Sequence, residues 1–185
     1  LKNATTYQDW YGLSHDFPDL LSDAVYGLSE HYADAIMSAR LVACPGCYPT
    51  AVLTALLPVI KLGQVSCDDL IIDAKSGVTG AGRSLKETNL FSEIAEGLAP
   101  YGIAHHRHAP EIEQEIGFAA GSDNVTINFT PHLVPMNRGE LVTIYAKTNG
   151  AKADDVRASL NAFYDDKHFV RIVGAEETPA TRHVR

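Results

Sequence analysis

Residues 41–62, LVACPGCYPTAVLTALLPVIKL, have the pattern of a strand, a tight turn and a long apolar helix. A short apolar strand over 41–43 runs into the turn sequence CPGC, and a helix follows directly. We expect this helix to begin at Pro49, because proline is favoured at the first helical position, and to stop at Gly63. Apolar residues occur on nearly every side of it, so the sequence predicts a buried helix, kinked at Pro58.

The rest of the chain mixes strands and helices. Val125, Ile127 and Phe129 alternate with polar residues, which is the period of a half-buried strand. The following loop, from Pro131 to Gly139, leads to a second strand, and we expect an antiparallel pair there. The fold class is therefore α+β rather than a doubly wound sheet. The predicted strands cover 69–74, 125–130, 141–147 and 169–173, and the predicted helices lie near 19–23, 29–37, 110–117 and 154–164.

The composition describes an acidic globular chain. Its 185 residues, 45% of them hydrophobic, can bury a sizeable core. The formal net charge of −8 argues against a nucleic-acid partner, since such surfaces are usually basic. No apolar run reaches the ~18 residues of a membrane-spanning helix, and no signal peptide is visible. Three cysteines are too few for a disulfide framework, so we expect a cytoplasmic protein.

Cys47 is the strongest candidate for a reactive residue. It precedes the predicted helix, where backbone N–H groups and the helix dipole favour a thiolate and could also hold an oxyanion or a phosphate. A packed, unreactive thiol at a strand–helix corner is the plain alternative. Cys44 and Cys47 also match C-x-x-C, so a redox dithiol stays open, as does half of a zinc site, for which Cys67 has no close partner.

Three histidines, His105, His106 and His108, stand within four residues. They could ligate a metal, act as a general base, or lie on a solvated loop. Glu111 follows His106 by five residues and stands at the start of a predicted helix. A carboxylate there could orient an imidazole, as in sets of a nucleophile, a base and an orienting group.

A glycine-rich loop, SGVTGAGR at 76–83, follows a predicted strand. Glycines such as Gly77 and Gly80 permit close approach of the backbone to an anion, and Ser76 and Arg83 could bind phosphate oxygens. The G-x-x-G-x-G spacing is weak by itself, and a flexible surface turn is the plain alternative.

Several segments together resemble one family. They are YG at 11–12, AVYGL at 24–28, PGCYPT at 45–50, SGVTGAGR at 76–83, HRHAPEI at 106–112 and FTPHL at 129–133. Each motif is modest alone, but their order and spacing are highly specific, and the likeness covers essentially the whole chain. The chain resembles the N-acetyl-γ-glutamyl-phosphate reductases of arginine biosynthesis, in the aspartate-semialdehyde-dehydrogenase-like superfamily.

The resemblance implies a division of the chain. Such enzymes join an NADP-binding Rossmann domain to a catalytic and dimerisation domain, of the type found at the C-terminus of glyceraldehyde-3-phosphate dehydrogenase. We expect residues 1–43 to connect from an NADP-binding domain, and residues 44–185 to form the catalytic and dimerisation domain, a mixed sheet covered by helices. The Rossmann fingerprint and the family's last helix are not in this sequence, so this chain alone is expected to be inactive.

The resemblance also implies a mechanism. Cys47 would attack the γ-acyl phosphate and expel phosphate, and hydride from NADPH would convert the thioacyl enzyme to N-acetylglutamate semialdehyde. His106 would be the acid and base, with His108 as the alternative, and Glu111 would orient the imidazole. The implied substrate-binding residues are Arg83, Arg107, His108 and Arg138. From the sequence alone, an ordinary loop arginine without a role in binding is an equally good interpretation of Arg138. The implied NADP-binding residues are Ser76, Gly77 and Gly80, and no metal is expected.

Two other functions stay open at this point. One is another acyl-phosphate reductase, such as aspartate-semialdehyde dehydrogenase, against which the HRHAPE run at 106–111 argues. The other is a non-catalytic dimerisation or metal-binding domain built on Cys44, Cys47 and the histidines. The expected partners are a small acyl-phosphate substrate and further copies of the chain, as a dimer or tetramer, with no nucleic acid and no membrane.

Overall fold

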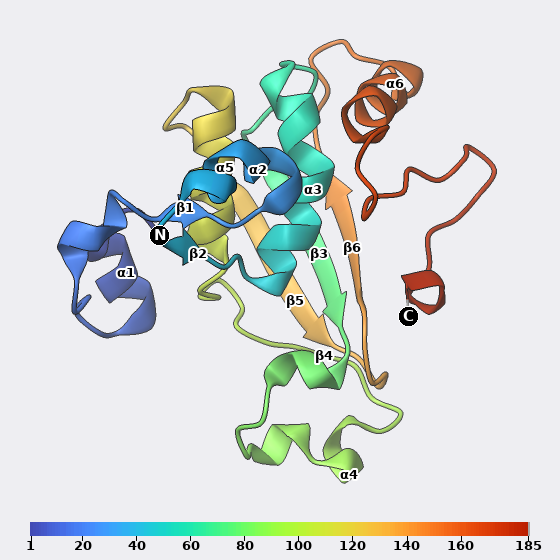
Figure 1. The fold of residues 1–185 in the computed structure, drawn as a ribbon. Coiled ribbons are helices and arrows are strands. Elements are labelled where there is room, and N and C mark those ends of the chain that lie inside the picture. Colours follow the sequence, from blue (N-terminus) through green and yellow to red (C-terminus); the bar gives the residue numbers. More distant parts are fainter. Residues whose placement is uncertain (185) are drawn as a thin grey trace.

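The computed structural model describes residues 1–184, whose centre is a four-stranded mixed sheet (Figure 1). The strand order is β4-β5-β3-β6. The central strand β3 runs parallel to β5 and antiparallel to β6. The strand bounds are β3 Leu70–Ser76, β4 Ala99–Pro100, β5 Ile127–Leu133 and β6 Glu140–Tyr145.

The predicted pairing of the two strands after residue 125 is wrong. β3 lies between β5 and β6, so these two strands contact β3 rather than each other. Pro131, expected in the loop, lies inside β5, opposite Ala74 of β3. A proline is tolerated there because β5 is nearly an edge strand. On the side away from β3, it pairs only with the two-residue strand β4.

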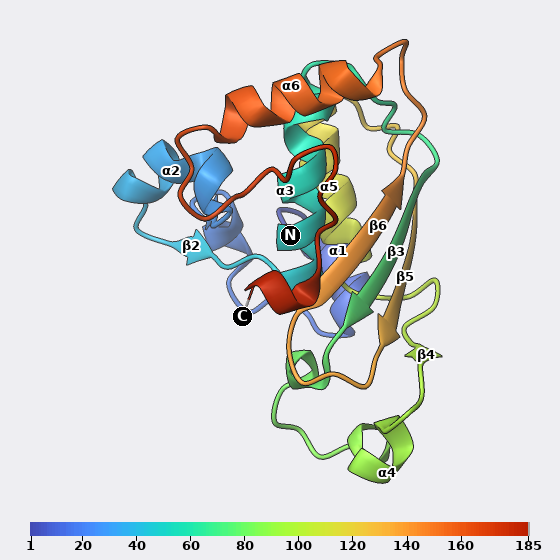
Figure 2. The same cartoon turned by 90° about the vertical axis from the view of Figure 1, so that its right-hand side faces the viewer.

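Helices α3 (Cys47–Lys61) and α5 (Ala109–Ala120) pack on one face of the sheet, and α6 (Ala153–Tyr164) crosses the far end of α3 (Figure 2). The expectation of a buried helix after the CPGC turn is confirmed, since Val52, Leu53 and Leu57 have no exposed surface. α3 begins two residues before Pro49, so its first helical residue is Cys47.

The N-terminal part of the chain contains more regular structure than expected. It comprises α1 (Ala4–Tyr11), a 3-10 helix (Pro18–Leu21), β1 (Val25–Tyr26), α2 (Ser29–Ser38) and β2 (Val42–Ala43). α1 was not predicted. Its N-cap is Asn3, whose side chain accepts a hydrogen bond from the Thr6 backbone N–H. β1 and β2 form a small parallel pair, and Leu28 between them and α2 is only 2% exposed, within the main core.

Two further segments frame the site. Between β3 and β4, the glycine-rich loop forms a 3-10 helix (Val78–Ala81), and an arm of residues 83–98 follows, with a 3-10 helix (Glu87–Asn89) and α4 (Phe91–Ile94). The arm projects beyond the end of the sheet (Figure 1). The predicted strand over 169–173 is wrong: no strand forms there, and Phe169 is 88% exposed because no neighbouring strand covers it. In the described chain, no helix has the length and apolar character needed to cross a membrane.

Candidate active site

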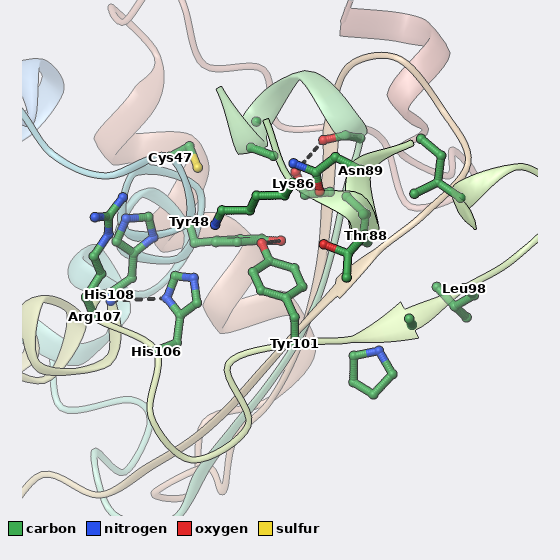
Figure 3. A pocket seen from close by; sticks show the side chains of 18 of the residues that line it. Cys47, Tyr48, Lys86, Thr88, Asn89, Leu98, Tyr101, His106, Arg107 and His108 are labelled. Carbon is green, nitrogen blue, oxygen red and sulfur yellow. Dashed lines mark hydrogen bonds between the residues drawn. The ribbon is translucent and has the colours of Figure 1, made fainter. Parts of the chain in front are cut away.

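A cleft of about 670 Å³ opens where α3 begins, beside the carboxyl end of β3. Its walls come from the start of α3, the glycine-rich loop, the arm and the loop before α5. Figure 3 shows the Cys47 sulfur on one wall and the side chains of His106, Tyr101 and Lys86 directed into the same space. The polar and reactive side chains on these walls include Cys47, Tyr48, Ser76, Lys86, Tyr101, His106, Arg107 and His108.

Cys47 stands at the position that helix polarity makes favourable for a thiolate, but its surroundings oppose one. The thiol is free, and the residue as a whole is exposed although its sulfur lies against the cleft wall. Partial burial of the sulfur against the cleft wall, together with the nearby Glu140 carboxylate, raises the pKa of the thiol to about 11. The backbone N–H groups of Cys47 and Tyr48 lower the pKa by a smaller amount. The N–H groups at the start of the helix therefore lower the pKa of the thiol, as expected from the sequence, but burial and Glu140 raise it by more.

His108 packs directly against the turn that carries the cysteine. A Cβ placed on Gly46 would lie 2.5 Å from Nε2 of His108, so only glycine leaves room for the ring. The buried Nδ1 of His108 has no hydrogen-bond partner among the described residues. Burial, with a contribution from the charge of Arg107, lowers the pKa of His108 to about 4, so the imidazole is neutral near pH 7.

His106 lies beside His108, with ring centroids 4.7 Å apart. Its Nδ1 accepts a hydrogen bond from the backbone N–H of His108 at 3.2 Å, so in the neutral ring the proton is on Nε2. Burial, followed by the charges of His108 and Arg107, lowers the pKa of His106 to about 4. Neither imidazole hydrogen-bonds the thiol in the described chain, and the choice between them stays a prediction.

Glu111 does not contact either imidazole through a described hydrogen bond. Its Oε1 accepts from the Tyr26 hydroxyl at 2.6 Å and from the Gly46 backbone N–H at 2.8 Å. The expected role as orienter of an imidazole is therefore replaced by a contact to the cysteine turn. The reason is geometric: Glu111 in the first turn of α5 faces the N-cap of α3, and the imidazoles precede that turn.

The glycine-rich loop reaches the cleft, but its backbone donors are already used. The N–H groups of Gly77, Val78 and Thr79 donate to backbone carbonyls of residues 136–139. A Cβ on Gly77 would lie 2.8 Å from the backbone nitrogen of Arg138, which explains why glycine is needed there. Of the predicted NADP-binding residues, Ser76, Gly77 and Gly80 all line the cleft.

The cations near the cleft differ from those expected. Arg83 and Arg138 are exposed and are not among the residues that line it. Arg107 does line it, with its guanidinium 5.7 Å from the centre of the Tyr11 ring. Lys86, which no motif indicated, extends into the cleft from the arm (Figure 3).

Two tyrosines form a hydroxyl pair on the cleft wall. The hydroxyl oxygens of Tyr48 and Tyr101 are 2.9 Å apart. Burial raises the pKa of both phenols, so they remain protonated and can donate hydrogen bonds. Tyr48 lies within the PGCYPT motif, but nothing in that motif indicated a role for it. Tyr101 belongs to no motif, so no pattern in the sequence indicated it.

Cys44, Cys47 and Cys67 are all free thiols. Across residues 1–184, no cluster of three or more histidine, cysteine, aspartate or glutamate side chains is arranged to hold a metal ion. The described residues around Cys47 therefore offer no set of ligands for the zinc alternative.

Curated relatives match the whole chain. It is 47% identical to an N-acetyl-γ-glutamyl-phosphate reductase of Lachnoclostridium phytofermentans over 185 residues, which cover 100% of this chain and 53% of the relative. It is 50% identical to the reductase of the same name from Rhodospirillum rubrum over 186 residues, with the same coverage, 100% and 53%. The chain thus spans about half the length of these relatives.

Solved structures and a family model agree on the fold. A probable aspartate-semialdehyde dehydrogenase from Pseudomonas aeruginosa superposes with a TM-score of 0.61 at 17% identity, covering 86% of this chain and 54% of that one. The family model described as "Semialdehyde dehydrogenase, dimerisation domain" matches residues 47–185. The α+β fold with a mixed sheet is confirmed by this likeness, and the chain belongs to the semialdehyde dehydrogenase dimerisation-domain family.

Proposed function

We propose that this chain is the catalytic half of an N-acetyl-γ-glutamyl-phosphate reductase, which reduces the acyl phosphate to N-acetylglutamate semialdehyde in arginine biosynthesis. The observation that carries the proposal is the position of Cys47: the first residue of α3, on the wall of a cleft that also holds His106 and His108. The names of the relatives, at 45–50% identity, support the choice of substrate.

Cys47 is the nucleophile in this proposal. Its sulfur bonds to the acyl carbon, the bond from that carbon to the phosphate oxygen breaks, and phosphate leaves. The thiol proton passes to a base in the cleft, and the acyl group stays on the sulfur as a thioester. The backbone N–H groups at the start of α3 point at the reacting atom and stabilise charge that develops there.

A neutral imidazole suits the second half of the reaction. His106, with its proton on Nε2, can hydrogen-bond the carbonyl oxygen of the thioester and stabilise the negative charge that builds on that oxygen. His108 remains the alternative, because its ring lies against Gly46, next to the cysteine. Glu111 acts on the turn rather than on an imidazole: by accepting the Gly46 N–H, it fixes the residue before the nucleophile.

The substrate carries anionic groups, and the protein has a formal net charge of −8, so positively charged side chains are needed at the site. Arg107 and Lys86 line the cleft and are the side chains placed to meet a phosphate or a carboxylate. Arg83 and Arg138, also expected to bind the substrate, lie on the arm and on the loop before β6, and they do not line the cleft.

The residues present fit one end of NADP. When bound, NADPH supplies the hydride that reduces the thioester. Ser76, Gly77 and Gly80 line the same cleft as Cys47. A Cβ on Gly80 would lie 2.9 Å from the Ser76 hydroxyl oxygen, so glycine leaves space there. These residues would hold the nicotinamide end of the cofactor. The rest of the cofactor needs residues outside this chain, so the chain alone is expected to be inactive.

The decisive experiment uses the full-length enzyme, with this chain joined to its nucleotide-binding half. Cys47→Ser is expected to abolish phosphate-dependent reduction of NADP by N-acetylglutamate semialdehyde, while circular dichroism shows an intact fold. Cys44→Ser is the matched control, three residues away on an exposed turn, and it should have a much milder effect.

Either of two results would contradict the assignment. Substantial activity in Cys47→Ser would remove the nucleophile. Equal loss in Cys44→Ser would favour a dithiol. Comparing turnover of N-acetyl-γ-glutamyl phosphate and β-aspartyl phosphate distinguishes the proposed enzyme from its rival, since an aspartate-semialdehyde dehydrogenase would prefer β-aspartyl phosphate. Stoichiometric zinc that leaves only on unfolding would favour a metal-binding domain instead.

Copies of the chain are proposed to associate through the open face of the sheet. The family description names a dimerisation domain. The face away from the helices exposes apolar side chains on adjacent strands, with Ile71 45%, Leu141 41% and Tyr145 59% exposed. We also place the protein in the cytoplasm, for which the three free cysteines give compositional support.

A further inference from the structure

The AVYGL motif at residues 24–28 has no part in the proposed mechanism, yet it lies against the cysteine turn, residues 44–46. Within this motif, β1 pairs in parallel with β2, and β2 leads directly into the turn (Figure 1). The Gly27 backbone N–H donates to the Ala43 carbonyl at 2.9 Å. A Cβ on Gly27 would lie 2.9 Å from Cγ1 of Val42, so glycine allows this close approach of the two strands.

A single carboxylate oxygen connects the motif to the turn. Oε1 of Glu111, in the first turn of α5, accepts from the Tyr26 hydroxyl at 2.6 Å and from the Gly46 backbone N–H at 2.8 Å. Glu111 is only 8% exposed, so an oxygen that lost one of these donors would be poorly solvated. Hydrogen bonds to a carboxylate are shorter and stronger than those between neutral groups. The three residues therefore form a bridge from β1 to the residue before Cys47.

The backbone of Gly46 has one partner within α3 and one outside it. Its carbonyl accepts from the Thr50 backbone N–H at 3.0 Å and from the Thr50 hydroxyl at 2.8 Å. Its N–H donates to Glu111 on α5, and the ring of His108 packs against its Cα. Because Cys47 follows directly, a shift of the Glu111 carboxylate would move the start of α3 and the nucleophile with it.

Tyr26 and Glu111 act on this turn from outside the cleft. Neither is among the described residues that line it, so neither contacts a molecule bound there. Burial, followed by the hydrogen bond to Glu111, raises the pKa of Tyr26 far above its ordinary value. The phenol therefore keeps the proton that it donates to the carboxylate.

We propose that Tyr26 is a positioning residue that, through Glu111, holds the cysteine turn in the place from which Cys47 attacks the acyl carbon. The proposal rests on the proposed function, since it takes Cys47 as the nucleophile. It gives the AVYGL motif a role in catalysis, although the segment up to residue 43 was expected only to connect two domains.

The test compares Tyr26→Phe with Tyr32→Phe in the full-length enzyme. Tyr32 is the matched control: its hydroxyl donates to Glu115 of α5 at the same distance, 2.6 Å, but Glu115 has no hydrogen bond to the cysteine turn in the described chain. We expect Tyr26→Phe to lower kcat about tenfold and to leave KM for N-acetylglutamate semialdehyde unchanged, because a displaced nucleophile slows the chemical step without altering the groups that bind substrate. Tyr32→Phe should leave both constants unchanged.

Hydrogen exchange at the Gly46 amide reports on the bridge without any substrate. In mass spectrometry of peptides that contain Gly46, we expect this amide to exchange about tenfold faster in Tyr26→Phe than in the wild type, and at the wild-type rate in Tyr32→Phe. A double-mutant cycle tests the route: in a Glu111→Ala background, Tyr26→Phe should have no further effect on kcat.

An unchanged kcat, or unchanged exchange at Gly46, in folded Tyr26→Phe would overturn the proposal. An equal fall of kcat in Tyr32→Phe would also overturn it, because loosening of the N-terminal segment would then explain the effect. If Tyr26→Phe does not fold, Glu111→Gln decides, since a neutral amide weakens both bonds of the bridge. Lower kcat with faster exchange supports the proposal, and wild-type values overturn it. Activity of Cys47→Ser, which tests the proposed function, is a separate readout.

Discussion

The imidazole of His108 occupies the space where any side chain at position 46 would lie. A Cβ on Gly46 would meet three atoms of the ring within 2.8 Å. The backbone of Gly46 is extended, with φ −66° and ψ 161°, so the requirement for glycine comes from the close approach and not from the backbone conformation. The position of the cysteine turn and the position of the imidazole are therefore set by one contact.

Gly46→Ala is expected to disturb both groups at once. The overlap must be relieved by moving the ring or the turn, which should lower the free energy of unfolding by about 1–3 kcal/mol, as overpacked sites do. Urea denaturation monitored by circular dichroism measures this change. Gly174→Ala is the control, since its Cβ would meet nothing closer than 3.8 Å. Equal stability of Gly46→Ala and wild type would mean that the ring is not held against the turn.

Three histidines make stability depend on pH with a defined sign. Burial lowers the pKa of His31, His106 and His108 to about 4, from 6.5 in the unfolded chain. Between these values the unfolded state binds more protons, so the free energy of unfolding is full above about pH 6.5 and falls as pH drops toward 4.

His31→Gln isolates one part of this dependence. Nε2 of His31 lies 2.8 Å from the Tyr164 hydroxyl, far from the cleft, so the change does not touch the candidate site. Urea unfolding at pH 7.5, 6 and 5 should show a shallower pH dependence than in the wild type. His168→Gln, on an exposed side chain, should leave the slope unchanged. A slope that His31→Gln does not alter would contradict the shift.

At the residue scale, the sequence predicted the site residues that lie within motifs, but it missed contacts between residues that are distant along the chain. Cys47, His106 and His108 meet in the cleft as expected. Glu111 was given the wrong partner. It accepts a hydrogen bond from Gly46, which lies 65 residues away along the chain. The position of Glu140 opposite Ser76 was missed because it depends on the register of β6 against β3, which no local pattern contains.

At the scale of elements, α5 ties the N-terminal part of the chain to the core through a row of polar side chains. Glu111 accepts from Tyr26, and Glu115, only 2% exposed, accepts from Tyr32 at 2.6 Å. Gln114 accepts from the backbone nitrogen of Lys2. The row follows the helical period, so one side of α5 holds residues 1–43 while its apolar side packs on α3.

Tyr32→Phe should loosen this attachment. It leaves a buried carboxylate oxygen of Glu115 without its donor, which is expected to lower the free energy of unfolding by about 1–3 kcal/mol. Chemical denaturation measures the loss. Tyr7→Phe is the control, because it keeps the stacked ring against Tyr11 and also removes one hydroxyl. A Tyr32→Phe protein as stable as the control would show that the Glu115 contact is not needed.

The same scale explains the errors in the predicted sheet. The 3.6-residue period and the turn chemistry found α3, α5 and α6, since helical signals are local. Strand signals give a strand but not its neighbour, so β5 and β6 were paired although β3 separates them. The apolar run near Phe169 has the composition of a strand, yet it pairs with no described strand and Phe169 stays exposed.

At the scale of the whole molecule, the helices leave one face of the sheet uncovered (Figure 2). Register places Asp73 and Lys75 of β3 on this open face, between the apolar side chains of Ile71 and Leu141. A flat, mixed surface of this kind is suited to contact with a second copy, in which each patch meets its own symmetry mate.

Ile71→Glu tests this association directly. Across a two-fold interface the substitution would bring like charges together or bury carboxylates without partners, so a dimer of the full-length enzyme should dissociate. Sedimentation velocity is expected to show the mass of a monomer at concentrations where the wild type is a dimer. Leu62→Glu, 62% exposed at the C-cap of α3 on the other side of the molecule, adds the same charge and should leave the dimer intact. If Ile71→Glu sediments as the wild type does, the copies associate through another surface, and the open face of the sheet must have a different occupant.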